Sequence, residues 1–328
     1  MTSSPFWMEA FRKLLSPLAA RQATVLYLAS ALPLVTVALN GQNQVWVSLW
    51  VGMALWLYAR RSVAAAGFVL SVPFVLVKFL ALITVPAFIP REARRLRFAA
   101  SFAVAPVVVY GFLVLHHVDV LVPVWNERSA RTSGNLPYLL SAALAPFHCA
   151  LPTGIIDGMA LLILAAVALF IVLHQPVEPS AAALWALNLL ILTLMLASRK
   201  SYTTYLAMSF FPVCAIVAHE GITRLRVALF GVFGSVAMIE PTLWFRWLGG
   251  LHFLGLGLSA GVSVIPWKVA LFFSLDLTLL AFYVFYLRSS WRAYRVATGI
   301  VTATHPLTNV FQNPMQNDLA PAPGRGNI

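Results

Sequence analysis

The sequence predicts an all-α integral membrane protein, a polytopic bundle of helices. Of its 328 residues, 61% are hydrophobic and only 10% are charged, and the mean hydropathy is +0.86. These values lie far outside the range of soluble globular domains. Apolar segments recur along most of the chain, with charged residues singly or in short groups between them. We therefore expect about 8–10 transmembrane or re-entrant helices.

Hydropathy divides the chain into successive apolar segments, several of them shorter than the roughly 20 residues that cross a bilayer upright. The segments cover residues 24–39, 45–59, 62–77, 79–90, 98–115, 155–174, 181–197, 202–219, 225–245 and 268–288. The third and fourth are consistent with one broken helix, because Pro73 bends the chain shortly before Lys78. Half-helices and re-entrant pieces are therefore expected.

The segments form one transmembrane domain, residues 23–296, between two polar ends. Residues 1–22 contain basic side chains and no cleavage site after a short apolar core, so they predict a cytoplasmic or interfacial segment and not a removable signal peptide. Residues 297–328 are polar and rich in Pro and Gly, which predicts a disordered tail. Residues 116–153 form the longest polar connection inside the domain, and we expect an extracytoplasmic loop there.

Basic residues orient this domain, because loops rich in Lys and Arg stay in the cytoplasm. If residues 62–77 and 79–90 form a hairpin, most basic groups fall on one side: Arg12, Lys13, Arg21, Arg60, Arg61, Arg91, Arg94, Arg95, Arg97, Arg224, Arg226, Arg288, Arg292 and Arg295. We expect a multi-pass protein of the plasma (inner) membrane with that side in the cytoplasm. Because the net charge of +12 is spread along membrane flanks, nucleic acid is not an expected partner.

Several kinds of chemistry find no support. Cys149 and Cys214 lack a paired spacing, so both are interpreted as small core residues and not as a disulfide framework or a metal site. No two histidines stand at i and i+4 on a helix, and no Gly-rich phosphate loop is present. No metal site and no cofactor are predicted, although a divalent metal requirement stays open.

Three basic residues, at two places in the chain, depart from the flank pattern. Arg199 and Lys200 fall on the expected outer side, where they would hold an anionic ligand such as the phosphate of a lipid carrier. The alternatives are a lipid headgroup contact by two long side chains, or a different topology. Lys78 follows a bent apolar segment, so its ammonium needs water, a carboxylate or a ligand. A place at the tip of a hairpin, near the interface, would also satisfy it.

These positions belong to a series of short motifs. In chain order they are Gly41-Gln42-Asn43-Gln44, Ala65-Ala66-Gly67-Phe68 followed by Lys78 and Pro86, Trp125, Ser133-Gly134-Asn135-Leu136-Pro137, and Ser198-Arg199-Lys200-Ser201-Tyr202 followed by Pro212. Together these motifs resemble glycosyltransferase family 87. The resemblance covers residues 20–215. Taken by itself, Gly41–Gln44 is equally consistent with a polar turn after a helix.

The resemblance implies a GT-C membrane enzyme that transfers mannose, arabinofuranose or a related sugar from a polyprenyl-phosphate donor on the extracytoplasmic side. Its substrate-binding and phosphate-binding residues would be Gln42, Asn43, Lys78, Asn135, Arg199, Lys200 and Tyr205. Near the last of these the chain departs from the family pattern. Arg199 replaces a proline, Tyr202 replaces a tryptophan, and Thr204 and Tyr205 replace a pair of histidines.

The catalytic base is the largest departure. The family has its acidic base in a first outer loop well before the Gly-Gln-Asn motif, whereas only Glu9 precedes Gly41 here. We therefore expect either that the chain lacks an N-terminal part or that catalysis has been lost. Among the carboxylates present, Asp119 and Glu127 are the candidates on the outer side, although Glu127 is also placed to pair with Arg128.

The remaining carboxylates have structural interpretations. Asp157 stands near the start of a helix and predicts an N-terminal capping role. Glu240 at membrane depth is expected to pair with an arginine, and Asp276 with a cation such as Lys268. Surface positions are expected for Glu92, Glu178, Glu220 and Asp318.

The sequence as a whole predicts a membrane glycosyltransferase that uses a polyprenyl-phosphate-linked sugar, either truncated or inactive as it stands. Its partners would be membrane lipid, the polyprenyl-phosphate donor, and a glycan or glycolipid acceptor. Two other classes stay open: a flippase or transporter of lipid-linked sugars, although no internal repeat is evident, and a non-catalytic accessory protein of cell-envelope glycan assembly.

Overall fold

The all-α prediction is confirmed. The computed structural model describes residues 6–38, 44–76, 79–90, 94–120, 122, 132–144, 147, 151–247 and 266–301, and these contain helices and no strand. Five helical stretches in this part are long and apolar enough to cross a membrane: Pro17–Thr36, Arg94–Leu115, Thr153–His174, Arg224–Leu243 and Ala270–Ala297. The chain is therefore a polytopic membrane protein.

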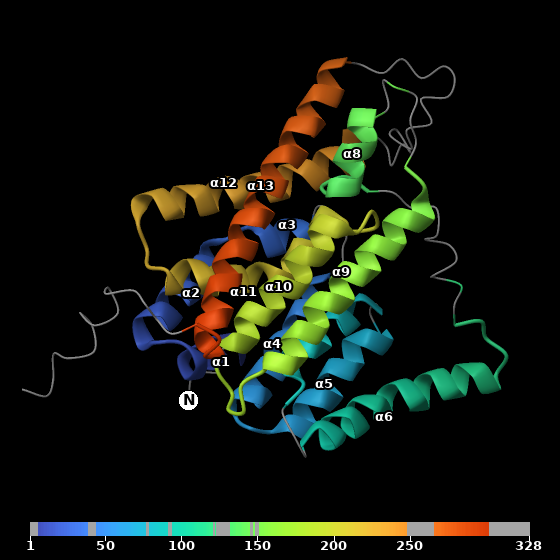
Figure 1. Cartoon of the computed structure of the whole chain (residues 1–328), viewed down its shortest axis with the longest axis vertical. Coiled ribbons are helices and arrows are strands. Elements are labelled where there is room, and N and C mark those ends of the chain that lie inside the picture. The colour runs from blue at the N-terminus through green and yellow to red at the C-terminus, as the bar shows by residue number, and fades with distance from the viewer. Residues whose placement is uncertain are drawn as a thin grey trace, which may run out of the picture.

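The helices follow the predicted apolar segments closely (Figure 1). They are α1 (Phe6–Leu14), α2 (Pro17–Ala29), α3 (Leu32–Ala38), α4 (Gln44–Ala59), α5 (Val63–Leu76), η1 (Phe79–Phe88), α6 (Arg94–Leu115), α8 (Leu136–Leu144), α9 (Thr153–His174), α10 (Ala182–Ala197), η3 (Thr203–Tyr205), α11 (Leu206–His219), α12 (Arg224–Trp247) and α13 (Pro266–Ala297), where η marks a 3₁₀ helix. The expected boundary at residue 22 falls inside α2, because Ser16 caps this helix and Pro17 begins it. The predicted tail lies outside the described residues from 302 onward.

Two short helices form the centre of the bundle. Nearly every residue of α10 and α11 is buried, and these helices pack against each other and against α2, α4, α9 and α13. Asn188 of α10 donates a hydrogen bond to the carbonyl of Pro212 in α11, at 2.9 Å. This contact satisfies a polar side chain that would otherwise be costly inside the bundle.

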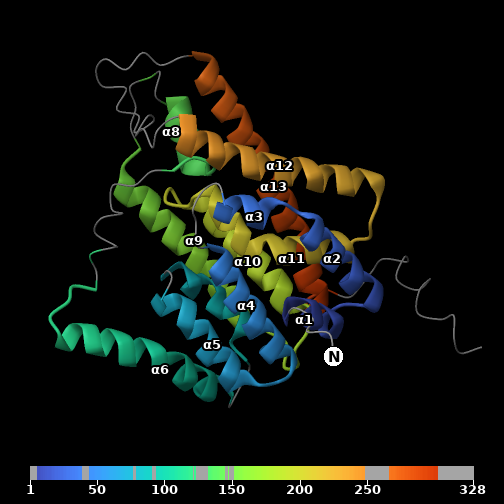
Figure 2. The same ribbon diagram turned by 180° about the vertical axis from the view of Figure 1, so that it is seen from behind.

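The outer helices present apolar surface. Only 6% of the spanning window of α6 and 11% of that of α9 is buried, and Val107, Leu161 and Leu162 are largely exposed. Figures 1 and 2 show α6 apart from the central helices, and it packs mainly against α5. Such surfaces are stable in contact with lipid and are rare on soluble monomers.

The basic residues gather at one end of the bundle. Arg60 bonds Glu9 at 2.9 Å, and Arg61 bonds Glu178 at 2.7 Å. Gln175 donates to the carbonyl of Ala87 at 2.6 Å, which brings the end of η1 to the same place. Because α5 begins at this end and η1 returns to it, the expected hairpin of residues 62–77 and 79–90 is present. We call this the basic end.

Candidate functional site

The opposite end of the bundle contains two polar turns. The first, Thr132–Asn135, precedes α8 and has Gly134 at φ +76°, a left-handed conformation that favours glycine. The Asn135 side-chain oxygen accepts from the backbone N–H of Tyr138 at 2.9 Å, and its amide donates to the carbonyl of Thr132 at 2.8 Å. Asn135 therefore caps α8 and closes the turn.

The second turn, Ser198–Tyr205, connects α10 to α11. Ser201 donates to the carbonyl of Ser198 at 2.7 Å, which folds the chain back after α10. The two turns are joined by Thr132, whose backbone N–H bonds the carbonyl of Arg199 at 3.0 Å. The Thr132 hydroxyl bonds the carbonyl of Ser201 at 2.8 Å. Residues far apart in the chain thus form one polar surface, which we call the paired turns.

Arg199 is buried and forms a fork on Asp157. Its Nε lies 2.8 Å from Asp157 Oδ1 and its Nη2 lies 2.9 Å from Oδ2. The Arg199 side chain is 4% exposed and that of Asp157 is 43% exposed. The predicted capping role of Asp157 is wrong, because α9 begins at Thr153 and Asp157 stands in its second turn. The ion pair with Asp157 therefore uses the Arg199 N–H groups that were expected from the sequence to bind a phosphate.

Two buried carboxylates lie beneath the paired turns. Glu240 of α12 is 1% exposed and accepts a hydrogen bond from the Ser133 hydroxyl. Asp276 of α13 is 0% exposed. The expected arginine partner of Glu240 is wrong, because neither acid has an ion pair among the described side chains. The suggested partner Lys268 has its side chain outside this description.

Several buried polar atoms around these acids have no hydrogen-bond partner among the described residues. They are Glu240 Oε2, both Asp276 carboxylate oxygens, Thr203 Oγ1 and the Tyr283 hydroxyl. The Gly134 peptide faces Asp276, and the Thr203 hydroxyl faces both Glu240 and Tyr283, without reaching full hydrogen-bond geometry. We call Ser133, Thr203, Glu240, Asp276 and Tyr283 the acidic cluster.

The acidic cluster lies well inside the bundle. Asp276 stands ten residues after Pro266, the first residue of α13, which places it about 15 Å along the helix at 1.5 Å per residue. The 16 residues of α10 span only about 24 Å, less than the roughly 30 Å hydrocarbon layer. Irregular backbone such as the turn after α10 is tolerated at this depth only where protein or water surrounds it.

The structure brings together part of the predicted site. Asn135, Arg199, Lys200 and Tyr205 all belong to the paired turns or border them. Asp119 follows α6 and is exposed. Gln42, Asn43, Lys78 and Glu127 lie outside the described residues.

Sequence reasoning assigned Glu240 and Asp276 to ion pairs and so missed the acidic cluster. Both acids stand inside apolar segments of the sequence, and this position could have indicated the cluster. Ionisable groups are energetically unfavourable there and usually have a function. The neighbours of Glu240, Ser133 and Thr203, are not predictable from spacing.

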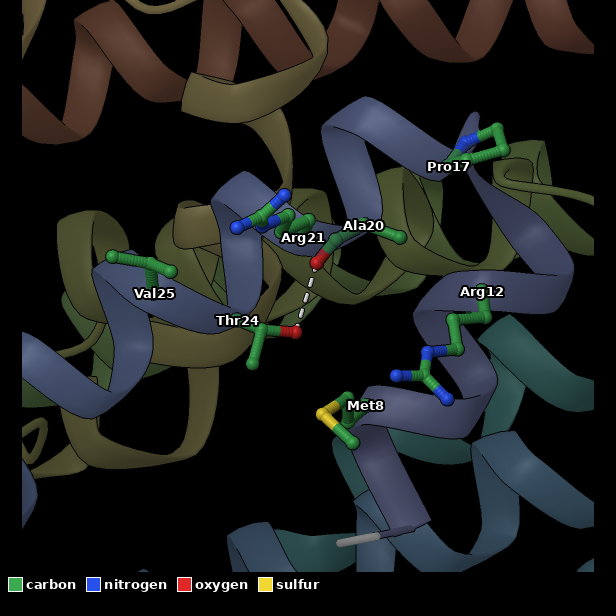
Figure 3. A pocket seen from close by; sticks show the side chains of 7 residues that line it. All are labelled: Met8, Arg12, Pro17, Ala20, Arg21, Thr24 and Val25. Carbon is green, nitrogen blue, oxygen red and sulfur yellow. Dashed lines mark hydrogen bonds between the residues drawn. The ribbon is translucent and has the colours of Figure 1, made fainter.

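A separate pocket of about 520 Å³ lies at the basic end, between α1 and α2 (Figure 3). Its lining residues are Met8, Arg12, Pro17, Ala20, Arg21, Thr24 and Val25. Thr24 donates its hydroxyl to the carbonyl of Ala20 at 2.8 Å, and the two arginines are exposed. Exposed arginines above apolar side chains suit the headgroup region of a membrane.

Comparisons with protein-family models, with curated proteins and with solved structures find no match for the chain.

Proposed function

We propose that this protein binds a polyprenyl-phosphate-linked sugar at the paired turns and takes part in glycosyl transfer from it, on the extracytoplasmic side. The observation that carries the proposal is the meeting of two motifs from the series that resembles family 87, Ser133–Pro137 and Ser198–Tyr202, which come together through Thr132. A coincidental resemblance would not require them to meet.

The chemistry of the paired turns suits a sugar phosphate. Lys200 is partly exposed beside the buried Arg199, so its ammonium is the better placed cation for a phosphate. Arg199 then acts as a positioning residue, because its ion pair with Asp157 holds the backbone that carries Lys200. The half-buried Tyr202 ring lies 5.6 Å from the buried Tyr205 ring beside this turn, and Tyr202 would offer an apolar face to a sugar ring.

The distribution of basic residues supports a position of the paired turns outside the cytoplasm. They lie at the end of α10 opposite to the ion pair of Arg61 and Glu178, and positively charged ends stay in the cytoplasm. Donor sugars on polyprenyl phosphate would reach them from the outer leaflet.

In the proposed reaction an acceptor hydroxyl attacks the anomeric carbon of the donor. The new glycosidic bond forms as the bond between that carbon and the phosphate oxygen breaks, and the electron pair leaves with polyprenyl phosphate. A base accepts the hydroxyl proton, for which Asp119 and Glu127 remain the candidates. Lys200 would stabilise the charge that develops on the leaving phosphate.

The test uses the full chain in nanodiscs with polyprenyl-phosphate mannose and arabinofuranose as probes. We expect saturable donor binding that falls about tenfold or more in Lys200→Gln, because a charge-assisted contact contributes about 1.5–3 kcal/mol. The matched control Arg94→Gln, at the basic end, should bind like the wild type. Equal affinities for wild type and Lys200→Gln would contradict the proposal.

The same preparation separates binding from catalysis. Sugar transfer that is lost in Asp119→Asn or Glu127→Gln would identify the base. Donor binding without transfer would assign the chain to the accessory class.

A second candidate function, transport of a lipid-linked sugar, is favoured by one observation. Carboxylates inside membrane helices commonly mark substrate or proton pathways, and Glu240 and Asp276 are such a pair. Movement of a labelled donor between leaflets of proteoliposomes, lost in Asp276→Asn, would support this candidate over transfer.

A further inference from the structure

We propose that the acidic cluster binds one hard divalent cation, of the magnesium, calcium and manganese class, between Glu240 and Asp276. The starting observation is the set of unpartnered buried oxygens, which come from three separate parts of the chain: the turn after α10, α12 and α13. Native interiors rarely leave such atoms unsatisfied, so a group of them around one point indicates a missing partner.

The charge of the cluster identifies the partner as a cation. When ionised, Glu240 and Asp276 contribute two negative charges, and no described basic side chain pairs with either. Burial of an ionised carboxylate without a partner is strongly unfavourable. One divalent cation would cancel both charges at once.

The chemistry of the ligands selects the class of cation. The available atoms are the carboxylate oxygens of Glu240 and Asp276 and the hydroxyl oxygens of Thr203 and Tyr283. Oxygen ligands of this kind are preferred by Ca²⁺, Mg²⁺ and Mn²⁺, whereas zinc favours nitrogen and sulfur. Among the described residues, no group of three or more His, Cys, Asp or Glu side chains could hold a metal ion, so the hydroxyl oxygens would have to complete the ligands that the two carboxylates begin.

The surrounding contacts support a preorganised site. The Ser133 hydroxyl already holds one oxygen of Glu240, as outer partners do when they orient metal ligands. Gly134 permits the close approach, because a methyl group there would collide with the Thr203 hydroxyl. A cation at this point would tie α12 and α13 to the paired turns. This inference does not depend on sugar transfer.

The test measures Mn²⁺ binding to the full purified chain after chelator treatment, by electron paramagnetic resonance, with no donor present. We expect one saturable site per chain, competed by Ca²⁺ or Mg²⁺. Asp276→Asn and Glu240→Gln should each weaken binding by about tenfold or more. Glu220→Gln, which alters a carboxylate paired with Arg226, is the control and should bind like the wild type.

The double variant Glu240→Gln/Asp276→Asn distinguishes loss of the metal ligands from loss of folding, because it keeps the shape of both side chains and removes both buried charges. It should melt at a higher temperature than the metal-free wild type, with no shift on adding Mn²⁺. Two results would overturn the proposal: no saturable Mn²⁺ binding by the wild type, as expected if the acids hold only protons, or unchanged binding by the double variant.

Discussion

Arg199 donates two parallel hydrogen bonds to Asp157, at 2.8 and 2.9 Å, and the Arg199 side chain is almost fully buried. The pair joins the turn after α10 to the second turn of α9. Planar bidentate contacts of this kind add geometric specificity as well as energy. Arg199 therefore fixes the backbone on which Lys200 is presented, and a lysine in its place would not reproduce the fork.

The first prediction follows from that contact. Arg199→Gln and Asp157→Asn should each lower the free energy of unfolding, because either substitution breaks the ion pair. The double variant cannot lose the same pair a second time, so a double-variant cycle should give a coupling energy of about 1–3 kcal/mol. Chemical unfolding in a fixed detergent measures it. Strictly additive effects would show that the fork contributes nothing.

The second prediction concerns Gly134. Its φ of +76° and its closeness to the Thr203 hydroxyl disfavour any side chain. Gly134→Ala should lower the melting temperature, since the left-handed conformation alone costs roughly 1–2 kcal/mol. Adding Thr203→Ala should restore part of the loss. The control Gly154→Ala, where an added methyl meets no atom, should leave stability nearly unchanged, and an equal loss there would contradict the argument.

The third prediction concerns pH. The Arg60 guanidinium, bonded to the Glu9 carboxylate, lowers the pKa of Glu9 below its ordinary value of 4.5. Because the folded-state pKa is depressed, the contact stabilises the fold above pH 4.5 and is lost as the pH falls through that lower value. Melting curves collected against pH should show this loss in the wild type and not in Arg60→Gln. Identical pH profiles for the two proteins would refute it.

The fourth prediction concerns orientation. In a chain without Cys149 and Cys214, a cysteine at Gly154 should react with a membrane-impermeant thiol reagent in intact cells, and one at Val177 should not. Both positions are exposed, and they lie at opposite ends of α9. The reverse labelling pattern would place the paired turns in the cytoplasm and remove the basis for an extracytoplasmic donor.

Much of the fold was predictable because membrane helices are defined by long apolar runs. The hairpin of α5 and η1 also followed from charge, since it returns the chain to the side of Arg61 before the basic residues Arg94, Arg95 and Arg97. The break at Ser30 between α2 and α3 was not predictable from an unbroken apolar segment.

The candidate site was predictable in part. Short motifs indicated Asn135 and Arg199, and these do lie together. Their contacts were not predictable, because the partner of Arg199 lies 42 residues away and that of Ser133 lies 107 residues away. Glu240 was assigned to an arginine by a general rule on intramembrane charge, whereas its true neighbours are hydroxyl groups.

If a sugar-phosphate lipid binds at the paired turns, it should protect a cysteine placed there from chemical labelling. Ser198→Cys, in the chain without Cys149 and Cys214, keeps side-chain size and leaves Lys200 in place. We expect a membrane-impermeant thiol reagent to label it from outside, and polyprenyl-phosphate mannose or arabinofuranose to slow that labelling where an anionic phospholipid does not. Labelling at an unchanged rate with either donor, or equal protection by the phospholipid, would contradict specific binding of a sugar-phosphate lipid at the paired turns.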